Sequence, residues 1–196
     1  MTFPHRLRLL FPALFAALVP AAGAQVATPA SPPASAAAPV PPARPAQPAQ
    51  PVDLFDFWLG DWDVRWTNAN GSPGHGRNHV ARTLDGRVIQ EDFEQDAADP
   101  PPRLVGRSLS VLQAGSGLWR QSWADNQGGY FALTGSVDGA NRLFTTAPVT
   151  AADGSVTLQR MVFRDIRPDA FTWDWEGSRD GGRSWQLLWQ LHYRRR

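Results

Sequence analysis

From position 52 onward, hydrophobic and polar residues alternate in short runs that are separated by turn sequences. The turns recur about every 8 to 14 residues, a spacing typical of β-sandwiches and β-barrels. The pattern predicts ten strands, over residues 61–67, 77–84, 87–95, 103–113, 118–124, 129–137, 142–149, 155–166, 170–178 and 184–194. Their connections are too short for crossover helices, so we expect an antiparallel meander.

The alternation also predicts which face of each strand is buried. Phe171, Trp173 and Trp175 occupy one face of their run, and odd-numbered positions of the run 185–193 are all large and apolar. A meander of this size with one aromatic face removes its free edges by closing on itself. The expected fold is therefore all-β, an antiparallel up-and-down barrel of about eight to ten strands.

A dense apolar stretch precedes and begins the first strand. It holds six large apolar side chains, those of Phe55, Phe57, Trp58, Leu59, Trp62 and Trp66. Such a segment must enter a core. Gly60 interrupts the run, so we expect a short helix over 55–59 and a first strand from Asp61.

Composition divides the rest of the chain. Residues 1–24 have a basic start, an apolar core over 9–19 and an Ala-Gly-Ala sequence at 22–24, the pattern of a cleaved signal peptide. An uncleaved membrane anchor is the alternative, but the apolar core is short for a span. Residues 25–51 are rich in Pro and Ala and are expected to be a disordered linker. The barrel domain is then 52–196, and the mature protein is expected to be periplasmic or secreted, with no membrane span.

Charge and cysteine content narrow the function classes. The chain has no cysteine, which excludes disulfides and thiolate metal sites. Loss of Arg6 and Arg8 with the signal leaves the chain close to neutral, and no basic stripe indicates nucleic-acid binding. The oligomeric state is left open.

Two sequence patterns, one short and one long, resemble known protein families. Gly60-Asp61-Trp62 resembles the Gly-x-Trp start of calycin barrels, the lipocalin and fatty-acid-binding superfamily. That resemblance implies that Trp62 closes one barrel end beneath an arginine of the last strand, for which Arg194 is the natural candidate.

A longer pattern covers 53–196. It consists of Phe-Asp-Phe-Trp-Leu-Gly-Asp-Trp at 55–62, Trp-Ala-Asp-Asn-Gln-Gly at 123–128, Ser-Arg-Asp-Gly-Gly-Arg-Ser-Trp at 178–185 and Tyr-Arg at 193–194. The pattern resembles DUF1579, a family of lipocalin-like bacterial domains of unknown function. The resemblance implies the fold and no activity.

The segment Ser178-x-Asp180-x-Gly182-x-x-Trp185 also fits the Asp-box of sialidase propellers. In such a hairpin the aspartate accepts hydrogen bonds from turn amides, the glycine takes a strained conformation, and the tryptophan packs beneath. A single copy in a domain too short for a propeller favours a structural hairpin over sugar chemistry.

Histidines offer little chemistry. His75 and His79 are four residues apart, in a segment that begins as a predicted loop and enters a strand. Neither an acidic residue nor a third histidine is near them in the sequence, so no metal site is expected. His192 suggests a haem-binding alternative, because the related barrel nitrobindin holds haem through a histidine near its C-terminal end. By alternation, however, His192 faces solvent. No cofactor is predicted.

The predicted function is a binding module for a small apolar or amphipathic ligand. Its expected site is the barrel interior, with Arg160 and Gln121 as polar anchors in a wall of Trp119, Trp123, Trp173, Trp175 and Trp189. For Arg160, an internal ion pair with Glu91 or Asp125 is the alternative.

No nucleophile elbow or phosphate loop is present in the sequence. An enzyme, such as a hydrolase or isomerase using the same cavity, is the alternative. A third possibility is that the aromatic side chains simply fill the core.

Overall fold

The computed structural model describes residues 48–97 and 102–196, and all structural statements below concern these residues. The expected signal peptide at 1–24, and the expected linker up to residue 47, lie outside the described residues. Gln50, which the sequence assigns to the linker, is bound to the barrel. Its amide nitrogen donates to the Gly117 carbonyl at 2.8 Å, and its side chain donates to the Gly135 carbonyl.

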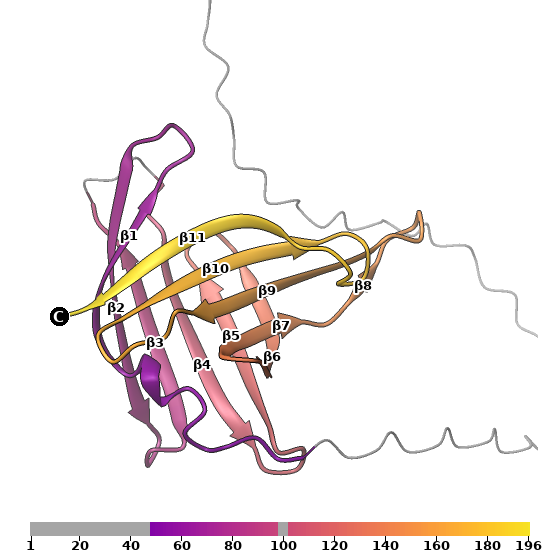
Figure 1. Ribbon diagram of the computed structural model, residues 1–196, viewed down its shortest axis with the longest axis horizontal. Coiled ribbons are helices and arrows are strands. Elements are labelled where there is room, and N and C mark those ends of the chain that lie inside the picture. The colour runs from indigo at the N-terminus through magenta and orange to yellow at the C-terminus, as the bar shows by residue number, and fades with distance from the viewer. Residues whose placement is uncertain (1–47, 98–101) are drawn as a thin grey trace, which may run out of the picture. The chain divides into compact units, whose positions relative to one another are not determined.

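The regular secondary structure of the described chain consists of strands and one 3-10 turn (Figure 1). The turn, η1 (Asp56–Trp58), precedes the strands. The strands are β1 (Gly60–Thr67), β2 (Pro73–Thr83), β3 (Val88–Gln95), β4 (Val105–Gln113), β5 (Leu118–Asp125), β6 (Tyr130–Asp138), β7 (Asn141–Thr146), β8 (Val149–Thr150), β9 (Val156–Arg164), β10 (Ala170–Ser178) and β11 (Gln186–Arg195).

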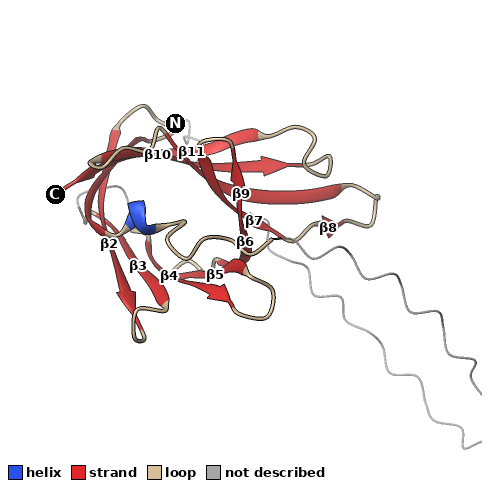
Figure 2. Cartoon of the chain, turned by 60° about the horizontal axis from the view of Figure 1, so that its bottom comes forward, coloured by secondary structure: helices blue, strands red, loops and turns tan. Residues whose placement is uncertain are grey.

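Ten of these strands form a closed ring (Figure 2). Each strand from β1 to β6 pairs with the strand that follows it in sequence. β7 pairs with β9, and the order continues through β10 and β11 back to β1. All these pairings are antiparallel, as the short connections require. The two-residue β8 adds only to the free part of β9. The predicted all-β, closed antiparallel meander is confirmed, whereas the predicted short helix is only a three-residue 3-10 turn.

The segment before β1 closes one end of the barrel. Phe55 is completely buried there, stacked on Phe144 with 4.3 Å between ring centroids and set edge-on against Trp119. The Trp119 indole donates to the Pro51 carbonyl at 2.9 Å. We call this the plugged end. Its aromatic side chains fill the space between the strands.

An arginine of the last strand does lie over Trp62, but it is Arg195 rather than the predicted Arg194. Alternation explains the correction. Tyr193 points inward, so Arg194 points to solvent and the next residue returns to the barrel end. The guanidinium of Arg195 also donates to the Leu59 carbonyl. Gly60 has φ +128°, and a methyl group there would meet this guanidinium at 2.2 Å.

The β10–β11 hairpin contains the Asp-box segment. The Asp180 carboxylate accepts hydrogen bonds from the amides of Arg183 and Ser184, both at 3.0 Å, and from the Ser184 hydroxyl. Ser178 donates its hydroxyl to the same carboxylate, and Gly182 has φ +88°. These contacts hold the hairpin closed, and the four hydrogen bonds keep the pKa of Asp180 well below its usual range.

A register shift at Trp175/Glu176 changes the face of the strand residues beyond it. The predicted last strand begins at 184, but β11 begins at Gln186. Trp185 therefore lies outside the barrel wall, where the guanidinium of Arg160 is 4.0 Å from its ring centroid. Simple alternation, which places Trp185 on the same face as Trp189, is wrong here because a bulge adds a residue to one strand.

Candidate functional site

At the end of the barrel away from η1, large aromatic side chains from five strands meet. We call this group the aromatic rim: Trp66, Trp123, Phe131, Trp173, Trp175 and Trp189. Trp66 is buried, while the other five are only partly buried. The plugged end differs, because Phe55, Trp58, Trp62 and Trp119 are at most 1% exposed there.

Ring contacts fix the orientation of the rim. Trp173 and Trp175 are parallel, with 6.2 Å between ring centroids, and Phe131 meets Trp175 edge-on at 5.1 Å. Trp189 is edge-on to both Trp173 and Trp66, at 6.0 Å and 5.4 Å. Such edge and stacked contacts each stabilise the arrangement. The rim is therefore a set of oriented surfaces.

Glycines on β2 and β4 make room for two of these indoles. A methyl group at Gly74 would lie 2.1 Å from the Trp66 indole, and one at Gly106 would lie 2.1 Å from the Trp123 ring. The rings thus lie directly against the backbone of the barrel wall. The Trp123 indole also donates to the Asp125 carboxylate at 2.9 Å, which fixes the ring further.

Deeper in the barrel than the rim, a set of polar side chains is buried. We call it the polar row: Asn78, Glu91, Ser108, Ser110, Gln121 and Tyr193. Its members come from β2, β3, β4, β5 and β11, and each is at most 6% exposed. Glu91 and Phe93 are two positions apart on β3, so their Cα atoms are about 7 Å apart along the strand and their side chains share the inner face.

Glu91 is the centre of the polar row. One carboxylate oxygen accepts from the Asn78 amide at 2.7 Å, and the other accepts from the Ser108 hydroxyl at 2.6 Å. The Asn78 amide also donates to the Tyr193 hydroxyl at 3.2 Å. Gln121 donates to Ser108 and Ser110, so the contacts run without a break from β11 to β5.

Two acceptors of the polar row are unpaired. The Asn78 Oδ1 and Gln121 Oε1 atoms are buried and have no hydrogen-bond donor among the described residues. An unpaired buried acceptor costs about 1–3 kcal/mol. Such a group indicates either a bound water or a ligand that donates to it.

Burial also changes the acidity of the polar row. Desolvation raises the pKa of Glu91 to about 7, and the hydrogen bonds from Ser108 and Asn78 only partly oppose it. Burial, together with the Glu91 charge, raises the pKa of Tyr193 well above its usual range. Near neutral pH, Glu91 therefore exchanges a proton while Tyr193 keeps its own.

The structure separates the residues that the sequence grouped into one ligand site. Trp119 lies at the plugged end, and Gln121 belongs to the polar row. Only four of the set lie together in the aromatic rim: Trp123, Trp173, Trp175 and Trp189.

The expected interior position of Arg160 is wrong. Its neighbour Met161 is in the core, so Arg160 points outward, and its guanidinium pairs with Glu176 at 2.6 Å. The expected alternative partners, Glu91 and Asp125, are not involved. On β10, Asp174 lies between the inward-facing Trp173 and Trp175 in sequence, yet it is only 1% exposed and is paired with Arg164.

Of the polar row, sequence reasoning named only Gln121 as an interior anchor and Glu91 as a possible internal partner of Arg160. It missed the other members, although alternation contains the signal. On β3, the buried positions Ile89, Glu91 and Phe93 alternate with polar neighbours. Asn78 and Val80 are likewise on one face of β2. A carboxylate between two large apolar residues of the same parity predicts a buried acid.

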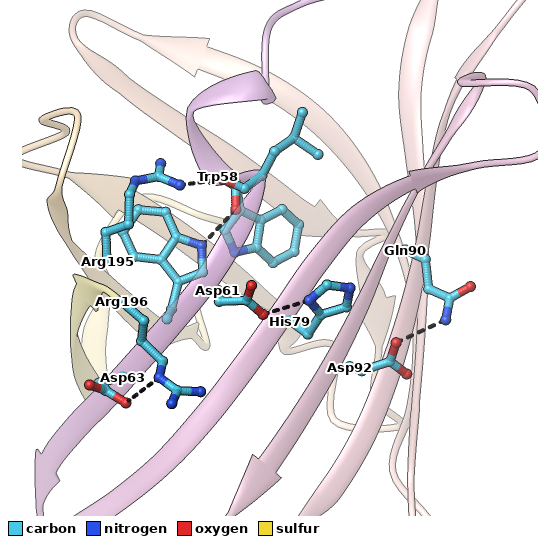
Figure 3. Close-up of polar contacts among 10 residues, drawn as sticks. Trp58, Asp61, Asp63, His79, Gln90, Asp92, Arg195 and Arg196 are labelled. Atoms are coloured by element: carbon cyan, nitrogen blue, oxygen red, sulfur yellow. Dashed lines mark hydrogen bonds and ion pairs between the residues drawn. The ribbon is translucent and has the colours of Figure 1, made fainter.

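The outer wall carries charged side chains in alternation. The Asp61 carboxylate accepts a hydrogen bond from the His79 ring at 2.7 Å, and Arg196 pairs with Asp63 at 3.5 Å (Figure 3). His79 thus has an acidic partner, which was not expected. His79 lies in a strand, as predicted, while His75, expected in a loop, also lies in β2. Two shallow hollows of about 310 Å³ and 170 Å³ lie on this wall, over β1 to β4. Neither is lined by the aromatic rim.

His192 is exposed, in agreement with its expected outward direction. Among residues 48–97 and 102–196, no three His, Asp or Glu side chains come together as a metal-ligand set. Within the same ranges, no helix is long and apolar enough to cross a membrane.

Comparison with known proteins gives limited information. No family model and no curated protein matches the chain, so the resemblance to DUF1579 stays a prediction. Among solved structures, a de novo designed fluorescence-activating β-barrel is 14% identical, with a TM-score of 0.39, over 74% of this chain and 99% of that one. The structure of EF1p2_mFAP2b bound to DFHBI is 12% identical, with a TM-score of 0.38, over 74% of this chain and 98% of that one. We therefore take the architecture from the strand pairing of this chain itself.

Proposed function

We propose that the protein is an exported binding module that takes a small apolar or amphipathic molecule at the aromatic rim. The observation that carries the proposal is the difference between the two barrel ends. Most aromatic side chains of the plugged end are fully buried, with Phe57 partly buried, while five of the six in the rim are partly exposed and held in fixed orientations. Barrel mouths with an apolar lining and a few converging polar groups are common ligand sites.

The polar row supports the same proposal. In a core that serves only for packing, a buried carboxylate and two unpaired amide oxygens cost stability and add nothing to the packing. Below an apolar rim, these groups supply the small number of polar contacts that orient a ligand. Indoles add to this, because each offers an apolar face and an N–H donor.

Uptake of N-phenyl-1-naphthylamine, a neutral apolar dye whose fluorescence rises on binding, tests the proposal. We expect saturable uptake at micromolar dye and a loss of at least fivefold in affinity for Trp175→Ala. Trp185→Ala is the matched control, because Trp185 lies outside the barrel wall, and it should bind the dye as the parent does. Absence of saturable uptake, or equal uptake by Trp175→Ala, contradicts the proposal.

Export is the second part of the proposal and rests on the sequence at 1–24. N-terminal sequencing of the protein from the periplasm or medium of its host tests it, with Gln25 as the expected first residue. Recovery of the intact 196-residue chain from the membrane fraction contradicts it.

One observation favours a second candidate, a proton-transfer enzyme. Glu91 is buried inside the barrel and has a pKa of about 7, which suits a general acid or base. A co-purified ligand, identified by native mass spectrometry, decides between the two. Incubation with the protein in D₂O should place deuterium on a ligand carbon if Glu91 moves protons, and Glu91→Gln should abolish the exchange. Ligand binding without deuterium exchange supports the binding module and not the enzyme.

A further inference from the structure

We infer that the ligand is an organic ammonium compound, with its apolar or aromatic body against the aromatic rim and its cationic head at Glu91. The inference rests on the proposed function and specifies the class of ligand. It follows from the acceptors and donors that face the interior below the rim.

The interior polar groups are mostly acceptors. Both Glu91 oxygens, the Asn78 Oδ1 and the Gln121 Oε1 can accept, and the latter two are unpaired. The donors nearby are already used, since the Asn78 amide binds Glu91 and Tyr193, and the Gln121 amide binds two serines. A head group that donates several hydrogen bonds fits this arrangement, and a carboxylate or phosphate does not.

The charge of the interior favours the same class. The groups facing Glu91 are neutral: Asn78 from β2, Ser108 from β4 and Tyr193 from β11. Its charged neighbour is the acid Asp92 on the same strand, and no arginine of the described residues forms an ion pair with Glu91. A buried carboxylate is stable as an anion only with a cationic partner, so a ligand cation completes this pair.

The rim suits a cation as well. Indole faces attract ammonium groups, and Trp is the most effective side chain for this. An ammonium compound therefore meets favourable surfaces from the rim to the carboxylate. Glu91 is two positions from Phe93 on β3, and Phe93 packs against Trp66, Trp123 and Trp189 of the rim, so a short ligand suffices to connect the rim with the carboxylate.

Titration calorimetry with three matched probes tests the inference: 2-phenylethylamine, 2-phenylethanol and phenylacetate. At pH 8 we expect the amine to bind at least tenfold more tightly than the alcohol, and phenylacetate to bind most weakly. In Glu91→Gln the amine and the alcohol should agree within twofold, with the affinity for the alcohol retained. Glu94→Gln is the matched control, a glutamate of the same strand on the outer face, and should keep the preference.

A measurement on the unaltered protein tests the inference even if Glu91→Gln does not fold. Amine binding at pH 7 should release protons, seen as a heat that changes with the ionisation enthalpy of the buffer, and alcohol binding should release none. Equal affinity for amine and alcohol, tighter binding of phenylacetate, or no binding of any probe while the dye still binds overturns the inference. All three of these results leave the proposed function standing. Failure of both the probes and the dye overturns the proposed function itself.

Discussion

The guanidinium carbon of Arg195 lies 4.2 Å from the ring centroid of Trp62, which places the last residue of β11 against the first buried residue of β1. The same guanidinium donates to the carbonyls of Leu59 and Pro168, both at 2.8 Å. A cation–π contact and a few hydrogen bonds of this kind are together worth about 2 kcal/mol. Arg195→Ala should therefore lower the free energy of unfolding by about 2 kcal/mol in urea denaturation.

Arg194→Ala is the control for that experiment, because Arg194 is exposed and lies on the opposite face of the strand. Its effect should stay within about 0.5 kcal/mol. Equal effects of the two variants would show that the contact with Trp62 does not stabilise the barrel.

Tryptophans at the two ends should respond differently to truncation. Trp119 is fully buried, so Trp119→Ala leaves a cavity and should cost about 3–5 kcal/mol. Trp175 is only partly buried in the rim, so Trp175→Ala should cost clearly less in the same denaturation experiment. A cost for Trp175→Ala as large as that for Trp119→Ala would identify the rim as packed core.

The stability of the protein should decrease as pH rises from about 5 to about 8. The pKa of Glu91 is raised from 4.5 to about 7 in the folded state, so the folded state binds more protons than the unfolded state between these values. The carboxyl therefore adds to stability below pH 4.5, and this contribution is lost as pH rises through 7. The total loss is about 3 kcal/mol from this group.

Denaturation of the parent and of Glu91→Gln at pH 5 and pH 8 measures this effect. The difference between the two proteins isolates Glu91 from other titrating groups. A parent that gains stability toward pH 8 relative to Glu91→Gln would have the opposite sign and would contradict the buried, uncharged state of this carboxyl.

Replacement of Asp180 should affect only the β10–β11 hairpin that its carboxylate holds. Its carboxylate holds the amides of Arg183 and Ser184, and these hydrogen bonds lower its pKa. In Asp180→Ala, hydrogen exchange of these two amides should accelerate, while the β1–β2 amides keep their protection. Below the depressed pKa the parent should show the same local acceleration, because a protonated carboxyl accepts more weakly. Unchanged exchange at Arg183 and Ser184 would contradict a hairpin held by Asp180.

Periodicity predicted the barrel well because each strand has its own alternating pattern and its own turn. The bounds of β10 were predicted to the residue, and most others fall within two residues. The misses have local causes. β2 begins at Pro73, four residues before the predicted start, because its glycines accommodate the Trp66 ring and hide the alternation.

The candidate site was less predictable because it depends on which strands meet across the interior. Alternation correctly placed Trp173, Trp175 and Trp189 inward, but it could not divide them from Trp119 at the other end. Arg160 was misplaced because a single charged residue in an apolar run has no parity signal of its own. Its face follows from pairing with Glu176, which only the folded chain shows.

The pairing of β1 with β11 has a consequence for how the chain is made. The first strand leaves the ribosome before the rest of the domain, yet its partner β11 is the last strand of the domain to be synthesised. Until then both β1 and the newest strand present unpaired edges, which attract other chains. Closure therefore waits for the whole domain, and it requires contacts between distant parts of the sequence, which form slowly. A chain shortened by the ten residues of β11 would retain every turn and still lack the strand that completes the ring.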